Sequence, residues 1–268
     1  MNDLKRKLAP VADAAWEEIE TEAKRTLRLT LAGRRAVDFI GPLGYAASSV
    51  ALGRTAKVAG PAIEGVEIRR REVLPLIELR TGFALSLAEL DDISRGAVDA
   101  DLGAVTEAAR RIALAEDQVI FEGCESVGIE GILSAAAASA LPMPVDAEGW
   151  PRALAGALNA LHATAVEGPF ALLLGTAEYT ALMTAVSGSG RRVIDHVTRL
   201  IDGGVHRAEA LSGALLLSTR GGDFELHVGR DFSIGYAGHN AENVSLYLQE
   251  TLSFRVPGPE AAIPFRPA

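Results

Sequence analysis

The sequence lacks most of the features that mark secreted, membrane-spanning and thiol-dependent proteins. It has one cysteine in 268 residues, Cys124, so no disulfide can form within the chain and no zinc site built from several thiolates is possible. No run of about 18 apolar residues is present to span a membrane. The basic start of the chain is not followed by the apolar stretch of a secretory signal. These absences predict a cytoplasmic protein, with Cys124 as a small buried apolar residue.

Motifs of common enzyme chemistry are missing as well. The sequence has no phosphate-binding loop, no G-x-S-x-G nucleophile elbow and no pair of histidines at helical metal-site spacing. A formal net charge of −9 argues against a general nucleic-acid binder. Asp195-His196 leaves a hydrolase as an alternative, whereas Glu116-Asp117 lie side by side on one helix and are expected to form salt bridges or caps to neighbouring loops. The motif search favours a non-enzyme with no metal and no cofactor.

What the sequence does contain is a long amphipathic helix at Val105–Gly123. Its apolar residues recur at helical spacing, nothing inside interrupts them, and Gly123 suits the left-handed residue that follows a helix. A second helical pattern runs over Pro10–Leu31 and is expected to stop at Gly33. Ser86, with a glutamate three residues later, predicts a capping box for a helix that ends near residue 95.

Between these helices the chain is expected to be extended. Arg34–Gly65 is punctuated by glycine and proline, and Val66–Phe83 is rich in β-formers. Pro75 lies inside the second stretch and cannot donate to a ladder, which predicts an edge or isolated strand. Because so long an extended segment has little core of its own, we expect it to need a partner, often another chain.

The second half of the chain mixes helices and strands, and a subdomain boundary is expected near Ala135–Gly149. The dipeptide Gly221-Gly222 followed by Asp223 indicates a hairpin turn between two strands. Helices are predicted at 150–166, 177–186 and 193–201, and strands at 170–174, 214–218, 224–228, 233–236 and 244–254. This segregation of strands predicts an α+β fold.

Short segments spread along the chain resemble encapsulin shell proteins, from about residue 2 to residue 256. They are KRKLAPVADAAWEEIETEA with LAGRRAVDFIGPLG near the start, then LPLIELR, ELDDISRG, EDQVIFEG with GIEGI, RGGDF, DFSIGY and YLQETLSF. The resemblance implies the tailed-bacteriophage major capsid protein fold. It implies an N-terminal helix and arm at 1–47, an extended E-loop at 48–82, a peripheral domain at 83–134 and 221–268, and an axial domain at 135–220.

The resemblance also implies a function. Encapsulins assemble into icosahedral shells, in the smallest case of sixty copies, and enclose a cargo enzyme through its C-terminal targeting peptide. Common cargos are ferritin-like iron-storage proteins and dye-decolorising peroxidases. The residues that correspond to the peptide-binding groove are Leu27, Leu31, Arg34, Asp38, Asp231, Ile234, Leu246 and Leu248. Leu27 and Leu31 have a simpler interpretation as residues that pack their helix onto its own subunit.

A glycine- and serine-rich loop corresponds to the axial loop at the five-fold pore of the family. It consists of Ser187, Gly188, Ser189, Gly190, Arg191 and Arg192. Two arginines predict an opening that favours anions, unless they pair with carboxylates such as Asp195. No flavin is predicted, because Ala88 stands where flavin-binding relatives have an aromatic residue. The alternatives are a phage or prophage capsid protein and, with less support, a hydrolase that uses His196.

Overall fold

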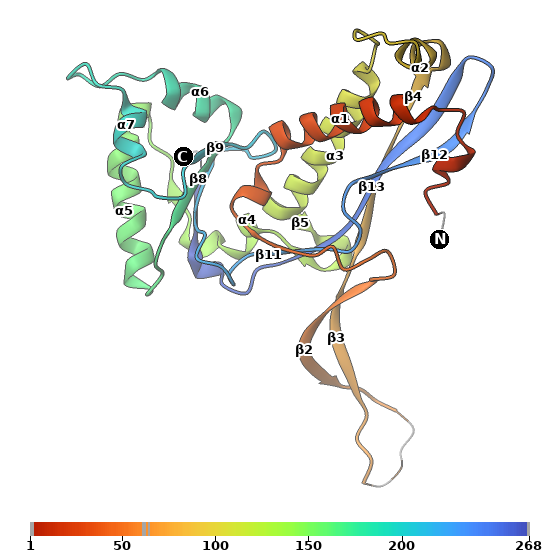
Figure 1. Cartoon of the computed structure of the whole chain (residues 1–268). Coiled ribbons are helices and arrows are strands. Elements are labelled where there is room, and N and C mark those ends of the chain that lie inside the picture. Colours follow the sequence, from red (N-terminus) through yellow and green to blue (C-terminus); the bar gives the residue numbers. More distant parts are fainter. Residues whose placement is uncertain (1–2, 61–62, 64, 267–268) are drawn as a thin grey trace.

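The computed structural model describes residues 3–60, 63 and 65–266. The expected arm, E-loop and C-terminal segments therefore include seven residues outside the described part: 1–2, 61–62, 64 and 267–268. Helices and strands form two five-stranded sheets and a hairpin that projects away from both (Figure 1). One hydrophobic core lies under the helices of the first sheet, and a larger one joins the second sheet to β11 (Glu225–Val228) and β13 (Asn243–Arg255) of the first. The predicted α+β class is confirmed.

The first sheet is organised by its longest strand, β13 (Asn243–Arg255). Strand β4 (Ile77–Ser86) pairs along one side of it, and β12 (Ser233–His239) and β11 (Glu225–Val228) follow each other along the opposite side. The short β1 (Asp38–Ile40) adds to β11 in parallel. The predicted strands at 224–228, 233–236 and 244–254 are confirmed.

Three helices cover the first sheet: α1 (Asp13–Thr30), α2 (Leu87–Ser94) and α3 (Gly103–Phe121). Their apolar faces share one core with β4, β12 and β13. The helix predicted from Val105 is confirmed as α3, and Gly123 after its end has the predicted positive φ of 87°.

Two expectations about helix ends are wrong. Gly33 begins a short 3-10 turn, η2 (Gly33–Arg35), and has no positive φ. It is required for space, because a Cβ there would lie 2.6 Å from Cδ1 of Ile120. Ser86 does precede α2, but its side chain makes no capping hydrogen bond, and Glu89 accepts one from the Asp101 N–H at 2.9 Å instead.

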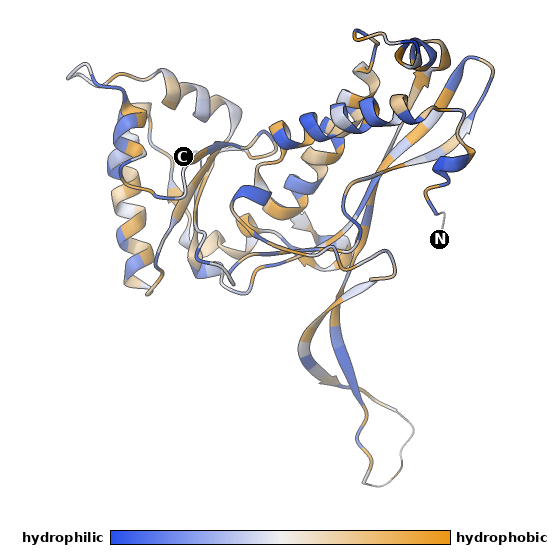
Figure 2. Cartoon of the chain, viewed as in Figure 1, coloured by the Kyte–Doolittle hydropathy of each residue, from blue (hydrophilic) through white to orange (hydrophobic). Residues whose placement is uncertain are grey.

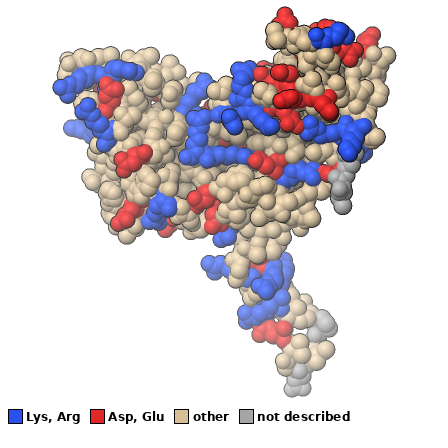
Figure 3. Space-filling model, in the orientation of Figure 1, with Lys and Arg blue, Asp and Glu red and all other residues tan. Residues whose placement is uncertain are grey.

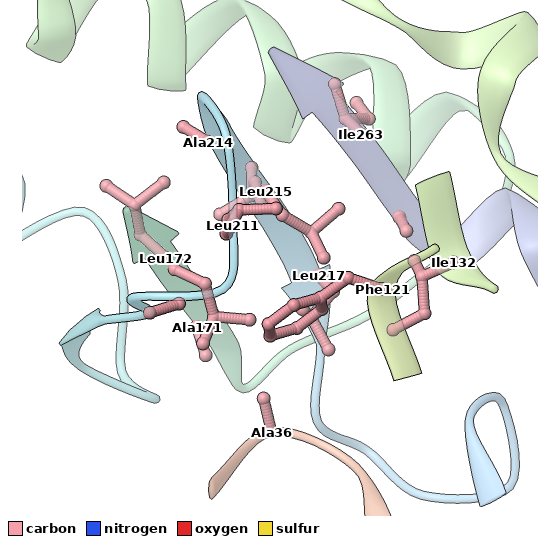
Figure 4. Close-up of a cluster of buried hydrophobic side chains, with 14 of the residues drawn as sticks. Ala36, Phe121, Ile132, Ala171, Leu172, Leu211, Ala214, Leu215, Leu217 and Ile263 are labelled. Carbon is pink, nitrogen blue, oxygen red and sulfur yellow. The ribbon is translucent and has the colours of Figure 1, made fainter. Parts of the chain in front are cut away.

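The second sheet has the order β7, β14, β10, β8, β9. Strands β8 (Phe170–Leu174) and β10 (Ala214–Ser218) are buried at every residue, which explains their unbroken apolar sequences. Phe121 from the end of α3 and Ile132 lie beside Leu217 of β10, so α3 also contributes to this core (Figure 4). The helices of this region are α5 (Trp150–Ala163), α6 (Thr176–Thr184) and α7 (Val193–Val197).

The chain passes between the two sheets in its last third. Strand β14 (Ala262–Arg266), in the segment 221–268 expected to belong to the peripheral domain, pairs with β10 of the second sheet. The turn at Gly221-Gly222 has positive φ at both glycines, but it joins strands of different sheets and makes no hairpin. The remaining short elements are β5 (Gly123–Cys124), β6 (Ile129–Glu130), α4 (Ile132–Ala135), β7 (Leu141–Pro142) and β9 (Val205–Arg207).

The projecting hairpin consists of β2 (Ser49–Lys57) and β3 (Arg69–Pro75), which pair only with each other among the described residues. Most of its side chains are exposed, and Figure 2 shows β3 as largely hydrophilic whereas the strands of the second sheet are hydrophobic. The stretch predicted as one strand is therefore two. It breaks after Pro75, and β4 continues from Ile77 into the first sheet.

Candidate functional sites

A cavity of about 460 Å³ lies between α1 and β12. We call it the groove. Residues of α1 form one wall, β12 and β13 form the other, and the first described residues of the chain close one end. Its lining residues are Leu4, Arg6, Glu20, Ala23, Lys24, Leu27, Arg28, Leu31, Arg34, Asp231, Phe232, Ser233, Ile234 and Leu248. The floor is apolar, and charged side chains stand along the rim; Figure 3 shows Lys and Arg as a blue band across the face that carries α1.

Most residues that the sequence assigned to a peptide groove lie together here. Six of the eight line the cavity: Leu27, Leu31, Arg34, Asp231, Ile234 and Leu248. The two leucines of α1 are also less than a tenth exposed within the core of the first sheet. Packing of the helix and lining of the groove are thus two roles of the same side chains.

The other two residues lie elsewhere. Asp38 is in β1 and accepts a hydrogen bond at 2.5 Å from the N–H of Gly222, so it holds the turn after β10 instead of facing the groove. Leu246 is 1% exposed within the core and does not line the cavity. Both positions differ from the expectation because strand pairing, which the sequence pattern does not reveal, decides which side they face.

Arg34 connects the groove to a buried group of carboxylates. Its guanidinium donates to both Oε atoms of Glu116 at 2.6 to 2.9 Å, to Oδ1 of Asp231 at 2.9 Å and to Oε1 of Glu250 at 2.5 Å. Glu116 and Glu250 are fully buried, and the rings of Phe39 and Phe232 lie 4.9 and 4.7 Å from the guanidinium carbon. These contacts, made through Nε and Nη2, fix the arginine in place at the groove.

The electrostatics of this group follow from burial. Burial lowers the pKa of Arg34, but the hydrogen bond to Glu116 and the charges of Glu116 and Glu250 together raise that pKa above its ordinary value. Burial, and next the charge of Glu116, raise the pKa of Glu250 well above its usual range. The second oxygen of Glu250 is buried without a hydrogen-bond partner among the described residues.

The Glu116-Asp117 pair was expected to form salt bridges or caps to neighbouring loops, and Asp117 forms a cap. Its carboxylate accepts from the N–H groups of Ala32 and Gly33 at 2.9 and 2.8 Å, so it caps the loop that follows α1. Burial raises the pKa of Asp117 to about 7, although these two backbone hydrogen bonds oppose the shift. The expectation that the pair forms a salt bridge and a cap is confirmed.

Sequence reasoning missed part of the groove. Ala23, Lys24 and Arg28 lie one or two turns before Leu31 on the same side of α1, and extending the helical period would have found them. Leu4 could not be found this way, because it reaches the groove through the 3-10 turn η1 (Arg6–Leu8). Glu250 is the single acidic residue of β13 and lies between Gln249 and Thr251, so no local pattern identifies it as the partner of Arg34.

The predicted pore loop is a tight exposed turn between α6 and α7. The N–H of Ser187 donates to the carbonyl of Arg191 at 2.8 Å, and Val186 and Arg192 form an isolated β-bridge. Gly190 has a φ of 79°. Neither Arg191 nor Arg192 forms a salt bridge with a carboxylate in the described part of the chain, so the alternative pairing with Asp195 is wrong.

The remaining sequence candidates find no assembled site. Nε2 of His196 is buried and has no hydrogen-bond partner among the described residues, so no hydroxyl nucleophile is bound to it. Within the same residues, no three side chains of His, Cys, Asp or Glu gather as metal ligands. No helix in the described ranges is both long and apolar enough to cross a membrane. Cys124 is a free, partly exposed thiol, not the fully buried residue expected.

Comparison with known proteins identifies relatives of this arrangement. A family model described as an encapsulating protein for peroxidase matches residues 1–253. A type 1 encapsulin shell protein from Rhodospirillum rubrum is 53% identical, with 99% of this chain and 97% of that protein aligned. The corresponding protein from Mycobacterium tuberculosis is 44% identical, with 98% of each chain aligned.

Solved structures agree with the fold. The virus-like particle from Pyrococcus furiosus aligns with a TM-score of 0.66 at 18% identity, over 93% of this chain and 98% of that one. The capsid of Myoviridae phage XM1 aligns with a TM-score of 0.54 at 10% identity, over 88% and 90%. The fold is that of tailed-phage capsid proteins, as predicted, and the sequence matches place the chain in the encapsulin shell protein family.

Proposed function

We propose that many copies of this chain assemble into a closed compartment that encloses a cargo enzyme. The observation that carries the shell role is the hairpin β2–β3, which projects from the body of the subunit. Its outer edges pair with no other strand in the described part of the chain, and Val73 of β3 and Val66 in the connecting segment are exposed. Such a hairpin needs a neighbour to satisfy its backbone and cover its side chains. Contacts of this kind close into a shell when they repeat around symmetry axes.

Electron microscopy tests the shell role. Negatively stained preparations of the purified chain should contain discrete hollow particles, and mass photometry should count sixty subunits in each. A monomer or small oligomer at the same concentration would contradict the proposal. Because the chain shares 43–53% identity with five shell proteins and 10–15% with five phage structures, we favour a cargo compartment over a phage head.

We further propose that the groove binds the C-terminal targeting peptide of the cargo. Support comes from an apolar floor that includes Leu27, Leu31 and Leu248, from the carboxylate of Asp231 in the lining, and from a size that accommodates a few side chains. The description of the matching family model names peroxidase, so a dye-decolorising peroxidase is one candidate cargo, and a ferritin-like iron-storage protein is the other.

Co-expression tests the groove. The candidate cargo is the protein encoded by the gene next to the gene of this chain. The probe is a fluorescent protein that carries the last 15 residues of that cargo at its C-terminus. Ser233→Tyr would fill the groove and should abolish loading, whereas Leu29→Ser, on an exposed face of the same helix α1, should not change it. Both variants must still form particles. Equal loading of the two variant shells would contradict the assignment.

The loop Ser187–Arg192 supports a third proposal, namely an opening that admits small anions. Its two arginines are exposed and have no carboxylate partner among residues 3–60, 63 and 65–266, and its other residues are glycines and serines. We propose a structural and transport role in the bacterial cytoplasm, without catalysis, cofactor or nucleic-acid binding by the shell itself. The chemistry would belong to the cargo.

A further inference from the structure

We propose that the groove receives its peptide as an added β-strand on the free edge of β12. This inference rests on the proposed function, because it takes the groove to be the peptide site. The occupant is an extended segment of about five residues, with apolar side chains at alternate positions and acidic residues beside them. The following observations lead to this binding mode.

The first observation concerns the direction of the backbone at Tyr236. Its N–H donates to the carbonyl of Leu4 at 2.8 Å, so it points away from the neighbouring strand β13. Residues two apart in a strand direct their N–H and C=O groups to the same side. Ile234 and Tyr236 both pair with β13, and the register is unbroken between them. Ile234 therefore also directs its N–H and C=O groups away from β13.

The pattern on β13 agrees. The N–H of Thr251 donates to Arg230 at 3.0 Å, so Thr251 directs its backbone groups to the side on which β12 lies. Gln249 and Tyr247 share that direction, and their partners in the register are Ser233 and Gly235. Ser233 and Gly235 thus use their backbone N–H and C=O groups in hydrogen bonds to β13, whereas Ile234 does not. No hydrogen bond to the Ile234 backbone from outside the sheet is found in the described part of the chain.

The chain's own N-terminal segment already uses this edge. Leu4 pairs with Tyr236 and lines the groove, and η1 then turns the chain away toward α1. The edge from Asp231 to Tyr236 spans roughly 16 Å at about 3.3 Å per residue. That length suits a segment of about five residues, which would continue the row of hydrogen bonds that Leu4 begins.

The walls of the groove define the side chains of the segment. Alternate residues of an added strand would face the floor at Leu27 and Leu31, and the others would face the rim. On the rim, Arg6 and Lys24 share one carboxylate, Glu20, and Arg28 forms no salt bridge within the described residues. This surplus of positive charge complements acidic residues on the segment.

A proline scan of the peptide tests the added strand. The fluorescent cargo with the 15-residue tail is co-expressed with the shell, and each tail position is changed to proline and, separately, to alanine. Proline removes an N–H, and the alanine variant corrects for the lost side chain. We expect loading to fall about tenfold more with proline than with alanine at alternate positions of a five-residue stretch, and less than about twofold between them.

The outcomes separate this inference from the proposal on which it rests. A tail that loads but responds uniformly along the stretch would overturn the added strand alone. Shells that exclude even the unmodified tail would overturn both. Hydrogen exchange provides a second measurement: loading should slow exchange of the Ile234 N–H, because the N–H groups of Phe232 and Tyr236 already have partners. Unchanged exchange at Ile234 in loaded shells would contradict the edge pairing.

Charge on the rim is tested on the shell itself. Arg28→Ala and Lys24→Ala should each weaken loading by about threefold to tenfold. Arg25→Ala is the matched control, because Arg25 is on the same helix but does not line the groove. An equal loss in all three variants would reject recognition of acidic residues at the rim.

Discussion

Two sets of arginines in this molecule show opposite uses of one side chain. Arg34 is 18% exposed and held by three carboxylates and two aromatic rings. Arg191 and Arg192 are exposed on a turn and have no carboxylate partner in the described part of the chain. The buried arginine joins α3, β13 and the loop after α1 into one unit. The exposed pair contributes charge to a surface and little to the fold.

The largest effect should come from removing the buried arginine. Arg34→Ala leaves Glu116 and Glu250 without a counter-charge, and breaking one partner of such a buried network costs about 3–5 kcal/mol. Arg191→Ala is the matched control and should change stability by less than about 0.5 kcal/mol. Guanidinium denaturation of assembled shells measures both. Identical midpoints for the two variants would contradict the contrast.

Asp117 beside this network should make stability depend on pH. Its pKa in the fold, about 7, is above the ordinary 3.8, so between those values the folded chain retains a proton that the unfolded chain has lost. The contribution of this group is therefore greatest below about pH 4, falls as pH rises, and levels off above about pH 7. Glu250 acts in the same direction.

Asp117→Asn does not titrate, so its stability should fall less steeply between pH 4 and 7. Asn has one acceptor oxygen for the two backbone N–H groups where the ionised Asp117 has two, so the variant should also be destabilised by about 1–3 kcal/mol above pH 7. Thermal unfolding midpoints at several pH values check both effects. Parallel curves for the wild type and the variant would show that Asp117 is not the titrating group.

A glycine lies close to each set of arginines, and the two glycines differ in how much space surrounds them. Gly33 precedes Arg34, and a Cβ there would lie 2.6 Å from Ile120 and 3.0 Å from Asp117, so Gly33→Ala should cost about 1–3 kcal/mol. Gly188 precedes the exposed pair, and a Cβ there meets nothing within 4 Å. Gly188→Ala should be neutral within about 0.5 kcal/mol. Equal losses in thermal unfolding would mean that the space around Gly33 relaxes freely.

The same contrast explains what the sequence could predict. The apolar period of α3, its end at Gly123 and the apolar runs of β8 and β10 are local patterns, and they were sufficient to locate these elements. The sequence also predicted that Glu116 and Asp117 form salt bridges or caps to neighbouring loops, although it did not show which residues they contact. Six groove residues were predicted from the resemblance to encapsulin shell proteins. They come from distant parts of the chain, so local patterns alone would not have grouped them.

The rest depended on contacts between distant parts of the chain. Arg34 meets Glu250 across 216 positions, and no local pattern indicates that pairing. Strand β14 contains Pro264 and is only five residues long, so it gave no strand signal before it paired with β10. Asp38 was assigned to the groove because the pairing of β1 with β11, which turns it toward Gly222, was not visible.

The smallest effect on stability, and the sharpest on transport, should come from the exposed pair. Arg191→Ala combined with Arg192→Ala should leave unfolding unchanged, because neither side chain has a salt bridge to lose among the described residues. If the loop lines an opening, loss of two positive charges should slow the entry of anions and not of cations.

Quenching of a dye sealed inside the shell measures this entry, with iodide as the anion and caesium as the cation. We expect iodide quenching to slow about threefold to tenfold and to lose most of its dependence on salt, while caesium quenching stays constant or rises. Arg152→Ala removes an exposed arginine from α5, away from the loop, and should change neither rate. Equal slowing of both ions would mean that the arginines hold the loop open instead of selecting charge, so their exposure would serve the shape of the opening.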